Sequence, residues 1–217
     1  MSGRQPVRVV LFDIDGTLLD TREFILSAME HALRTHGLPV LARAELASQV
    51  GRPLEVIYGE MGVDAGLGAA LVESHRSFQG ENLHLAAAFP GASETLGTLA
   101  RAGLTLGAVT SRSRRTSVRT MELAGLAPYF DVIVSAEDAA ALKPDPAPLL
   151  FALGRLGESH EHAAMVGDTR HDIEAGKALG MFTVGATYGF GGEGIRESGP
   201  DVVIGDIREL PGLILDF

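Results

Sequence analysis

The sequence predicts an α/β protein: a Rossmann-like core, in which helices cover both faces of a parallel sheet, with an inserted all-helical cap. Two patterns lead to this prediction. From residue 91 onward, helical and strand-like segments alternate, which favours a parallel sheet with helical crossovers. Residues 22–88 show several helical patterns and no convincing strand, so we expect a helical insertion behind the first strand.

Six short apolar segments are the expected strands. They are rich in β-branched and aliphatic residues and are too short for buried helices. Their bounds are 7–12, 104–109, 132–134, 163–166, 182–186 and, more weakly, 202–204.

Four helices are expected between these strands. Apolar residues recur at helical spacing in each, and Gly103, Gly125 and Gly180 stand where a C-cap is expected. Their bounds are 93–102, 113–124, 148–156 and 172–179.

The insertion is expected to hold four further helices, at 23–36, 44–50, 54–61 and 67–83. The first is amphipathic and is followed by Gly37 and Pro39, which end helices. A turn at 89–91 (FPG) is a plausible hinge. The predicted domains are therefore a core of residues 1–20 and 90–217 and a cap of residues 21–89.

Composition narrows the class of partner. The chain has 217 residues, of which 46% are hydrophobic, so it can bury a sizeable core. Its net charge of −10 argues against nucleic acid or an anionic membrane as partner. The absence of cysteine excludes disulfides, thiolate catalysis and cysteine-ligated metal. The N-terminus (MSGRQPVRVVLFDID) resembles neither a signal peptide nor a membrane span, so we expect a soluble cytoplasmic protein, monomeric or homodimeric.

Polar side chains follow four of the expected strands. The carboxyl ends of parallel strands meet at one edge of a sheet, where ligands bind, so we expect these side chains to share a crevice. Four carboxylates, two hydroxyls and an ammonium are costly to bury together unless Mg²⁺ and a phosphate join them. The residues are Asp13, Asp15, Thr110, Ser111, Lys143, Asp168 and Asp172.

These motifs resemble those of the haloacid dehalogenase superfamily of phosphotransferases. The segment DIDGT, with Asp20 after it, is similar to the family's first motif, and Thr110, Lys143 and GDTRHD follow in the family's order. The similarity covers nearly the whole chain. The helical insertion behind the first motif resembles the C1 cap of the phosphoglycolate phosphatase and beta-phosphoglucomutase branch, as does GDIRELPGL near the C-terminus.

The resemblance implies a role for each carboxylate of the first motif. Asp13 would be the nucleophile that forms an aspartyl-phosphate. Asp15 would be the general acid for the leaving group and then the base that activates water. For Asp15 to act in the same site as Asp13, the chain must turn back after the strand, and we expect Gly16 to permit that turn.

The resemblance also implies the phosphate and metal ligands. Thr110, helped by Ser111, would donate to the transferring phosphoryl group, and Lys143 would stabilise its charge and that of the nucleophile. Mg²⁺ would bind Asp13, the backbone carbonyl of Asp15, and Asp168. Asp172 would hold a metal-bound water or the lysine.

Two arginine-containing segments are less informative. In the branch resembled, a cap loop such as VGRPLEV selects the substrate, so Arg52 could bind a second anionic group. A surface arginine beside a helix explains Arg52 equally well. For the run Arg112, Arg114 and Arg115, we favour a solvated helix start over a positive rim of the site.

Several non-catalytic structures can carry the same motifs. A calcium loop is excluded, because Gly16 is fourth from Asp13 and the closing Glu is missing. Thr110 with Ser111 could be a helix N-cap, Lys143 a solvated lysine, and GDTRHD a turn with Asp172 as an N-cap. His171 is expected to be a loop residue and not a ligand.

The leading hypothesis is an Mg²⁺-dependent phosphatase for a small phosphorylated metabolite. Phosphoglycolate is the first expectation among substrates, followed by pyrophosphate and by nucleotide or sugar monophosphates. A beta-phosphoglucomutase-like mutase is the enzymatic alternative, although the cap loop lacks the serine–arginine pairing expected of it. Outside enzymes, a receiver-like phospho-switch shares a phosphorylated Asp, Mg²⁺ and Lys, but has no need of Asp15.

Overall fold

The core of the protein is a parallel sheet, as predicted. The computed structural model describes residues 6–215, and within them a six-stranded sheet has the order β5-β4-β1-β6-β7-β8, with every pair parallel. The six expected strands are all present, and their bounds lie within two residues of those expected. They are β1 (Val9–Phe12), β4 (Thr105–Val109), β5 (Val132–Val134), β6 (Ala163–Gly167), β7 (Phe182–Ala186) and β8 (Val202–Ile204).

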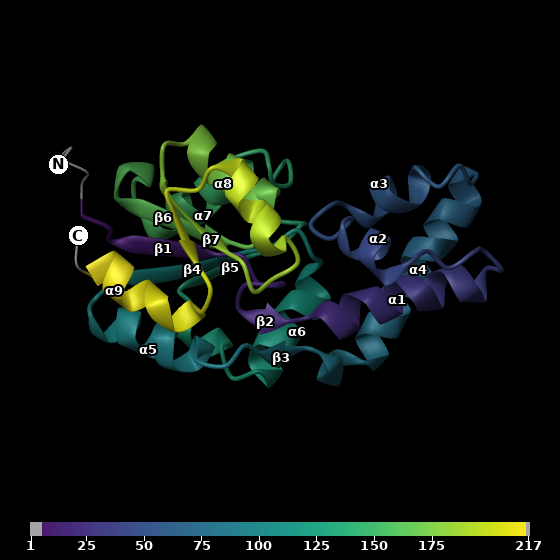
Figure 1. The fold of residues 1–217 in the computed structure, drawn as a ribbon, viewed down its shortest axis with the longest axis horizontal. Coiled ribbons are helices and arrows are strands. Elements are labelled where there is room, and N and C mark those ends of the chain that lie inside the picture. The colour runs from purple at the N-terminus through teal and green to yellow at the C-terminus, as the bar shows by residue number, and fades with distance from the viewer. Residues whose placement is uncertain (1–5, 216–217) are drawn as a thin grey trace.

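Helices cover both faces of this sheet (Figure 1). Alternate residues of β1 point to opposite faces, so Val10 and Phe12 join one apolar cluster while Val9 and Leu11 join another. The first cluster includes residues of α5 (Ala92–Arg101), α6 (Arg114–Leu123) and α9 (Leu210–Leu215). The second includes residues of α7 (Ala147–Leu156) and α8 (Arg170–Ala178). All four helices expected between the strands are present, and α9 was not predicted.

The insertion forms a separate helical lobe, on the right in Figure 1. It contains α1 (Arg22–Thr35), α2 (Arg43–Ala47), α3 (Leu54–Gly59) and α4 (Ala65–Glu81), close to the four helices expected. Its own apolar cluster is built around Phe24, Met29 and Tyr58. Short 3₁₀ helices complete the fold: Leu83–Leu85, Ala127–Tyr129, His160–His162, Gly192–Ser198 and Ile207–Glu209.

The prediction that residues 22–88 contain no strand was wrong at their end. β3 (Ala87–Ala88) pairs antiparallel with β2 (Leu19–Asp20), so the two chain passages between the lobes lie side by side. Backbone pairing of these two passages satisfies polar groups that the crossing exposes, and it needs no particular side chains. A two-residue strand of alanines therefore leaves no periodic pattern in the sequence.

Two predictions about the segment GDTRHD also need correction. Helix α8 begins at Arg170, with Thr169 as its N-cap, and not at Asp172. His171 is consequently a residue of the first helical turn and not of a loop. A side chain at Asp172 that bonds back to the N-cap backbone allows the helix to start earlier than apolar periodicity alone indicates.

Some predictions extend beyond the described residues. The proposed core includes residues 1–5 and 216–217, and the interpretation of the N-terminus as neither signal peptide nor membrane span rests partly on residues 1–5. Between residues 6 and 215, no helix combines the length and apolar character needed to cross a membrane.

Candidate active site

A tight turn follows β1 and carries the first two carboxylates. Asp13 continues the strand, since its N–H donates to Val166 O at 2.9 Å. The chain then reverses: Gly16 N–H donates to Leu19 O at 2.8 Å, with Gly16 at φ +88°, a conformation that favours glycine. As expected, this turn brings Asp15 to the same cavity as Asp13.

Lys143 lies at the centre of the buried polar groups. Its Nζ donates to Asp13 Oδ1 at 2.5 Å, Asp172 Oδ1 at 2.6 Å and Val109 O at 2.8 Å. These three bonds use all three protons of the ammonium. Burial opposes the charge of Lys143, but Asp13 and Asp172 outweigh it and raise its pKa above the usual range. The lysine is therefore a fixed cation between two carboxylates, and not a solvated side chain.

Asp168 is held by residues from two other loops. Thr17 Oγ1 donates to its Oδ1 at 3.0 Å, and the Phe190 N–H donates to its Oδ2 at 2.6 Å. The loop after β7 approaches so closely that a Cβ on Gly189 or Gly191 would overlap Asp168. Asp168 is fully buried, and these contacts fix its carboxylate at the end of β6.

Asp172 belongs to a capping box. Its Oδ2 accepts from the Thr169 N–H at 3.0 Å and from Thr169 Oγ1 at 2.8 Å, while its Oδ1 accepts from Lys143. The N-terminal turn of α8 also favours a negative charge here. The alternative in which Asp172 is itself the N-cap was wrong, because Thr169 holds that position and Asp172 is the third helical residue. The carboxylate of Asp172 bonds the N-cap residue and also orients the lysine.

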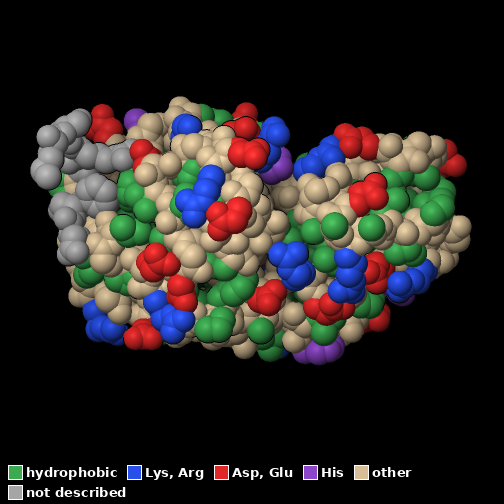
Figure 2. Space-filling view, viewed as in Figure 1, with side chains coloured by type: hydrophobic (Ala, Val, Ile, Leu, Met, Phe, Trp, Pro, Cys, Tyr) green, Lys and Arg blue, Asp and Glu red, His purple; other side chains and the backbone are tan. Residues whose placement is uncertain are grey.

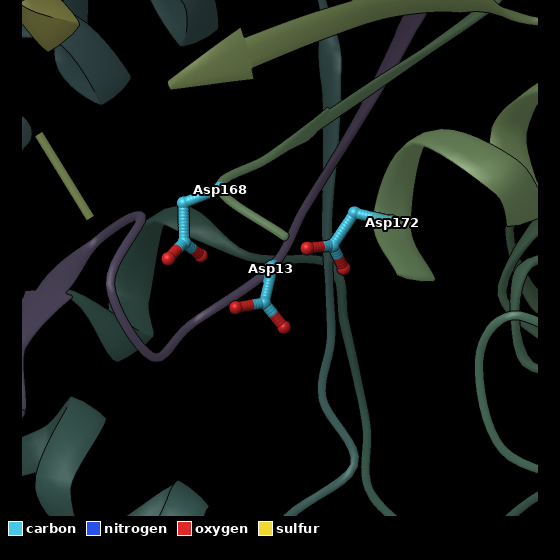
Figure 3. A group of neighbouring side chains, drawn as sticks. All are labelled: Asp13, Asp168 and Asp172. Carbon is cyan, nitrogen blue, oxygen red and sulfur yellow. The ribbon is translucent and has the colours of Figure 1, made fainter. Parts of the chain in front are cut away.

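Asp13, Asp168 and Asp172 converge in one group (Figure 3). One oxygen atom of each lies within 4.8 Å of the others. Burial, followed by the neighbouring carboxylates, raises the pKa of Asp168 well above its usual value. Burial raises the pKa of Asp13 to about 7, with Lys143 opposing and Asp172 and Asp15 adding to the shift. Buried like charges have this effect when nothing else compensates them.

The donor set of this group fits Mg²⁺. Among the described residues, three carboxylates of this group face one ammonium, so two negative charges lack a partner. Lys143 bonds Oδ1 of Asp13 and leaves Oδ2 without a hydrogen bond from a described residue. Hard carboxylate oxygens at the end of a parallel sheet are suitable ligands for a divalent cation. Asp13 and Asp168 offer oxygens for a metal, whereas the oxygens of Asp172 already accept three hydrogen bonds.

Asp15 faces away from this group, toward Thr110 and Arg112. Thr110 Oγ1 donates to Asp15 Oδ2 at 3.3 Å and accepts from the Arg112 N–H at 3.1 Å. Arg112 Nη1 lies 3.2 Å from Asp15 Oδ1, an ion pair whose angles do not make a hydrogen bond. The prediction that Arg112 is part of a solvated helix start was wrong, because its side chain is only 8% exposed.

The site opens into a cavity of about 320 Å³ between the two lobes. Figure 2 shows the surface hollowed at the upper edge of the view, where the lobes meet, with basic and histidine side chains beside the hollow. The hydroxyl of Ser111 lines the cavity, is buried, and has no described hydrogen-bond partner. Thr110 and Ser111 are not the N-cap of the following helix, because Ser113 holds that position.

Arg52 lines the same cavity but already has partners. Its Nη2 donates to Glu60 Oε1 at 2.6 Å, and its Nη1 donates to Gln49 Oε1. The neighbouring Gly51 lies against α8, since a Cβ built there would be 3.2 Å from His171 Nδ1. The structure therefore brings the predicted cap loop to the site, with its arginine occupied by cap residues.

Sequence reasoning missed Thr17, Arg112, Thr169 and the loop that holds Asp168. The glycines of TYGFGG, directly after β7, were the available signal for that loop, because they follow the end of a parallel strand. Arg112 had a weaker signal, being two residues after Thr110. Nothing in the sequence distinguishes it from Arg114, whose side chain is 54% exposed.

Comparison with known proteins agrees with this geometry. The sequence model of the haloacid dehalogenase-like hydrolases matches residues 10–186. Pyrophosphatase PpaX of Halalkalibacterium halodurans is 34% identical over 210 residues, covering 96% of this chain and 95% of that protein. Phosphoglycolate phosphatase of Yersinia pseudotuberculosis is 35% identical over 217 residues, covering 94% of this chain and 91% of that protein. The crystal structure of a "predicted phosphatase" from Clostridium acetobutylicum superposes with a TM-score of 0.89 at 26% identity, covering 98% of this chain and all of that one.

Fold and site together define an α/β phosphohydrolase. The chain belongs to the haloacid dehalogenase-like hydrolase family, and it is a phosphatase of that family.

Proposed function

We propose that the protein is an Mg²⁺-dependent phosphatase that hydrolyses a small phosphorylated metabolite through an aspartyl-phosphate on Asp13. The observation that supports this most is the position of Lys143, which holds Asp13 and Asp172 with bonds of 2.5 and 2.6 Å beside a cavity that Asp15 also lines. A nucleophile fixed by a cation, with a second carboxylate across the cavity, is an arrangement suited to phosphoryl transfer.

Asp13 attacks phosphorus with one of its two carboxylate oxygens, and the other remains available to the metal. One O–P bond forms to Asp13 while the bond from phosphorus to the leaving oxygen breaks, and Asp15 gives its proton to that oxygen. Asp15 then accepts a proton from water while the water oxygen bonds to phosphorus and the bond from phosphorus to Asp13 breaks. Inorganic phosphate is released and Asp13 is regenerated.

Ser111 would donate to the phosphoryl oxygens, because it lines the cavity and its hydroxyl has no described partner. Thr110 would donate to them after releasing Asp15, to which its hydroxyl is bonded at 3.3 Å. Asp13, the backbone carbonyl of Asp15, and Asp168 would hold Mg²⁺. When bound, Mg²⁺ supplies positive charge that stabilises the phosphoryl oxygens. Asp172 would keep Lys143 in place, and could also hold a water bound to the metal.

Two substrates are suggested by the relatives. Phosphoglycolate stays the first candidate because of the resemblance of the cap loop and of the C-terminal segment. Inorganic pyrophosphate is the second, since proteins named for activity on each substrate are about equally similar to this chain. Nucleotide and sugar monophosphates are the further candidates.

Phosphate release tests the proposal. We would measure it from phosphoglycolate, pyrophosphate, sugar phosphates, nucleoside monophosphates and p-nitrophenyl phosphate, with Mg²⁺ or with EDTA. We expect Asp13→Asn to lower kcat at least about a thousandfold, because no nucleophile remains. Asp20→Asn is the matched control, since Asp20 is exposed and lies outside the cavity.

Three results would contradict the proposal. Turnover by Asp13→Asn at the native rate would exclude Asp13 as the nucleophile. Full activity in EDTA would exclude the metal. A stable phosphorylated Asp13 without phosphate release would favour a mutase or a phospho-switch.

A further inference from the structure

Arg112 carries hydrogen-bonding capacity that the described protein does not use. Its Nη2 donates to Thr120 Oγ1 at 2.5 Å, but Nε and Nη1 are buried and have no hydrogen-bond partner. The guanidinium lies in the wall of the cavity, with the ring of Phe24 from the cap 5.2 Å away. A buried cation with unpaired donors is costly unless a ligand completes its bonding.

The cap presents two more polar side chains with unused hydrogen-bonding capacity to the same cavity. His75 and Gln79 are one helical turn apart on α4, and both are buried. Tyr58 Oη lies 3.0 Å from His75 Nδ1, and no described residue bonds Nε2 of His75 or the carboxamide of Gln79. If the tyrosine hydroxyl donates to Nδ1, Nε2 carries the proton and is a donor toward the cavity.

The other arginines of the cavity are already committed. Arg52 is held by Gln49 and Glu60, and Arg76 donates to Glu55 Oε1 at 2.8 Å. Their carboxylate partners neutralise them within the cap. Arg112 also has a carboxylate partner, Asp15, but it retains two unbonded donors.

We propose that Arg112 of the core, with His75 and Gln79 of the cap, forms a subsite for an anionic group that the leaving group carries next to its bridging oxygen. This inference rests on the proposed function, in which Asp15 protonates the bridging oxygen. Arg112 Nη1 is 3.2 Å from Asp15 Oδ1, so an anionic group one or two bonds beyond the bridging oxygen lies within reach of the guanidinium. A carboxylate and a second phosphate share this chemistry.

In this proposal Arg112, and not Arg52, is the arginine that selects the substrate. It also gives a reason for placing an arginine beside the acid, because a guanidinium can bind Asp15 and a ligand oxygen at once through different nitrogen atoms. Ethyl phosphate is the matched probe without the second anion, since it has the size of phosphoglycolate but no carboxylate.

The test compares kcat/KM for phosphoglycolate and for pyrophosphate with kcat/KM for ethyl phosphate. We expect Arg112→Met to lower either ratio about ten- to a hundredfold, the effect of losing a charged hydrogen bond. The substitution can also impair Asp15, but that effect lowers kcat/KM for every substrate and therefore cancels in the ratio. Gln79→Leu, which does not touch Asp15, should lower the ratio about threefold to tenfold, through KM more than kcat.

Two control variants complete the design. Arg119→Met removes an exposed arginine of α6 that pairs with Glu122, and it should leave both ratios unchanged. Arg52→Met tests the alternative anchor. If Arg52→Met lowers the ratios and Arg112→Met does not, the subsite is in the cap loop and the proposal is wrong.

The remaining outcomes are equally decisive. A change confined to phosphoglycolate identifies a carboxylate as the bound group, and one confined to pyrophosphate identifies a phosphate. Unchanged ratios in both Arg112→Met and Gln79→Leu overturn the inference. The proposed function is tested separately, by the loss of p-nitrophenyl phosphate hydrolysis in Asp13→Asn, so the two can fail independently.

Discussion

At the scale of single residues, the carboxylate of Asp172 is packed closely against the backbone at the end of β6. Gly167 at the end of β6 shows this: a Cβ there would overlap Cβ and Cγ of Asp172. Any side chain at this position displaces the carboxylate that orients Lys143. The glycine is required for space, because its φ is not in the left-handed region.

Gly167→Ala should therefore lower both activity and stability. We expect a loss of about 1–3 kcal/mol in the free energy of unfolding from overpacking, and a fall in kcat as Asp172 moves away from Lys143. Thermal unfolding and phosphate release measure the two effects. Gly154→Ala in α7 is the control, because a Cβ there meets nothing within 4 Å, and it should stabilise by about 0.4–1 kcal/mol. Native activity in Gly167→Ala would show that the site tolerates the displacement.

His75 makes a second prediction, on the pH dependence of stability. Burial, helped by the charges of Arg76 and Arg112, lowers its pKa to about 3. The unfolded chain, with a pKa near 6.5, binds a proton before the folded chain does, so stability is present above about 6.5 and lost as the pH falls toward 3.

Urea unfolding of the native protein and of His75→Gln measures this contribution. Between pH 7.5 and pH 5, the native protein should lose about 2 kcal/mol more than the variant. Equal losses in both proteins would mean that His75 is protonated in the folded state or accessible to water.

At the scale of elements, the capping box of α8 links helix stability to the site. Thr169→Val keeps the volume of the side chain but removes the hydroxyl that bonds Asp172 Oδ2 at 2.8 Å. We expect a loss of about 1 kcal/mol in the free energy of unfolding. We also expect tighter Mg²⁺ binding, because Asp172 then draws the Lys143 ammonium, whose charge repels the metal, away from Asp13.

The matched control is Ser159→Ala, which removes the cap of the 3₁₀ helix His160–His162. It should destabilise slightly without changing Mg²⁺ affinity, as measured by the Mg²⁺ concentration for half-maximal activity. If Thr169→Val and Ser159→Ala change stability alone, the capping box does not act on the site.

The same scale shows what the sequence could predict. Strands such as Val132–Val134 were predicted because short β-branched runs between helical patterns are typical of buried parallel strands. The acids were predicted to meet because they follow the carboxyl ends of strands in the same parallel sheet. β3 and the loop holding Asp168 were not found, because backbone pairing and close glycine packing leave no apolar period. The burial of Arg112 depends on Phe24, which is far away in the sequence, so no local pattern could indicate it.

At the scale of the whole molecule, the two lobes have separate buried apolar clusters, with Phe190 of the core packed against the cluster of the cap. The chain crosses between the lobes only twice within residues 6–215, at β2 and β3. Arg22 of the cap reaches the loop that holds Asp168, donating to Gly189 O at 3.1 Å. We propose that residues 21–89 move as a cap on this two-stranded connection, which would admit substrate and then exclude water.

Locking the lobes together tests this movement. A Cβ at Gly51 would lie 3.6 Å from Thr169 Oγ1 and 3.7 Å from Thr169 Cγ2, so cysteines at positions 51 and 169 are close enough for a disulfide. The chain has no native cysteine, so the variant Gly51→Cys/Thr169→Cys can form only this intramolecular bond. We expect the oxidised variant to lose at least about tenfold in kcat/KM relative to the same variant after reduction, because the reduced form keeps both substitutions and loses only the lock. Since the comparison is internal, strain at Gly51 or loss of the Thr169 cap affects both forms. Equal turnover by the two forms would mean that substrate reaches Asp13 without separation of the lobes here, and that the cap need not move.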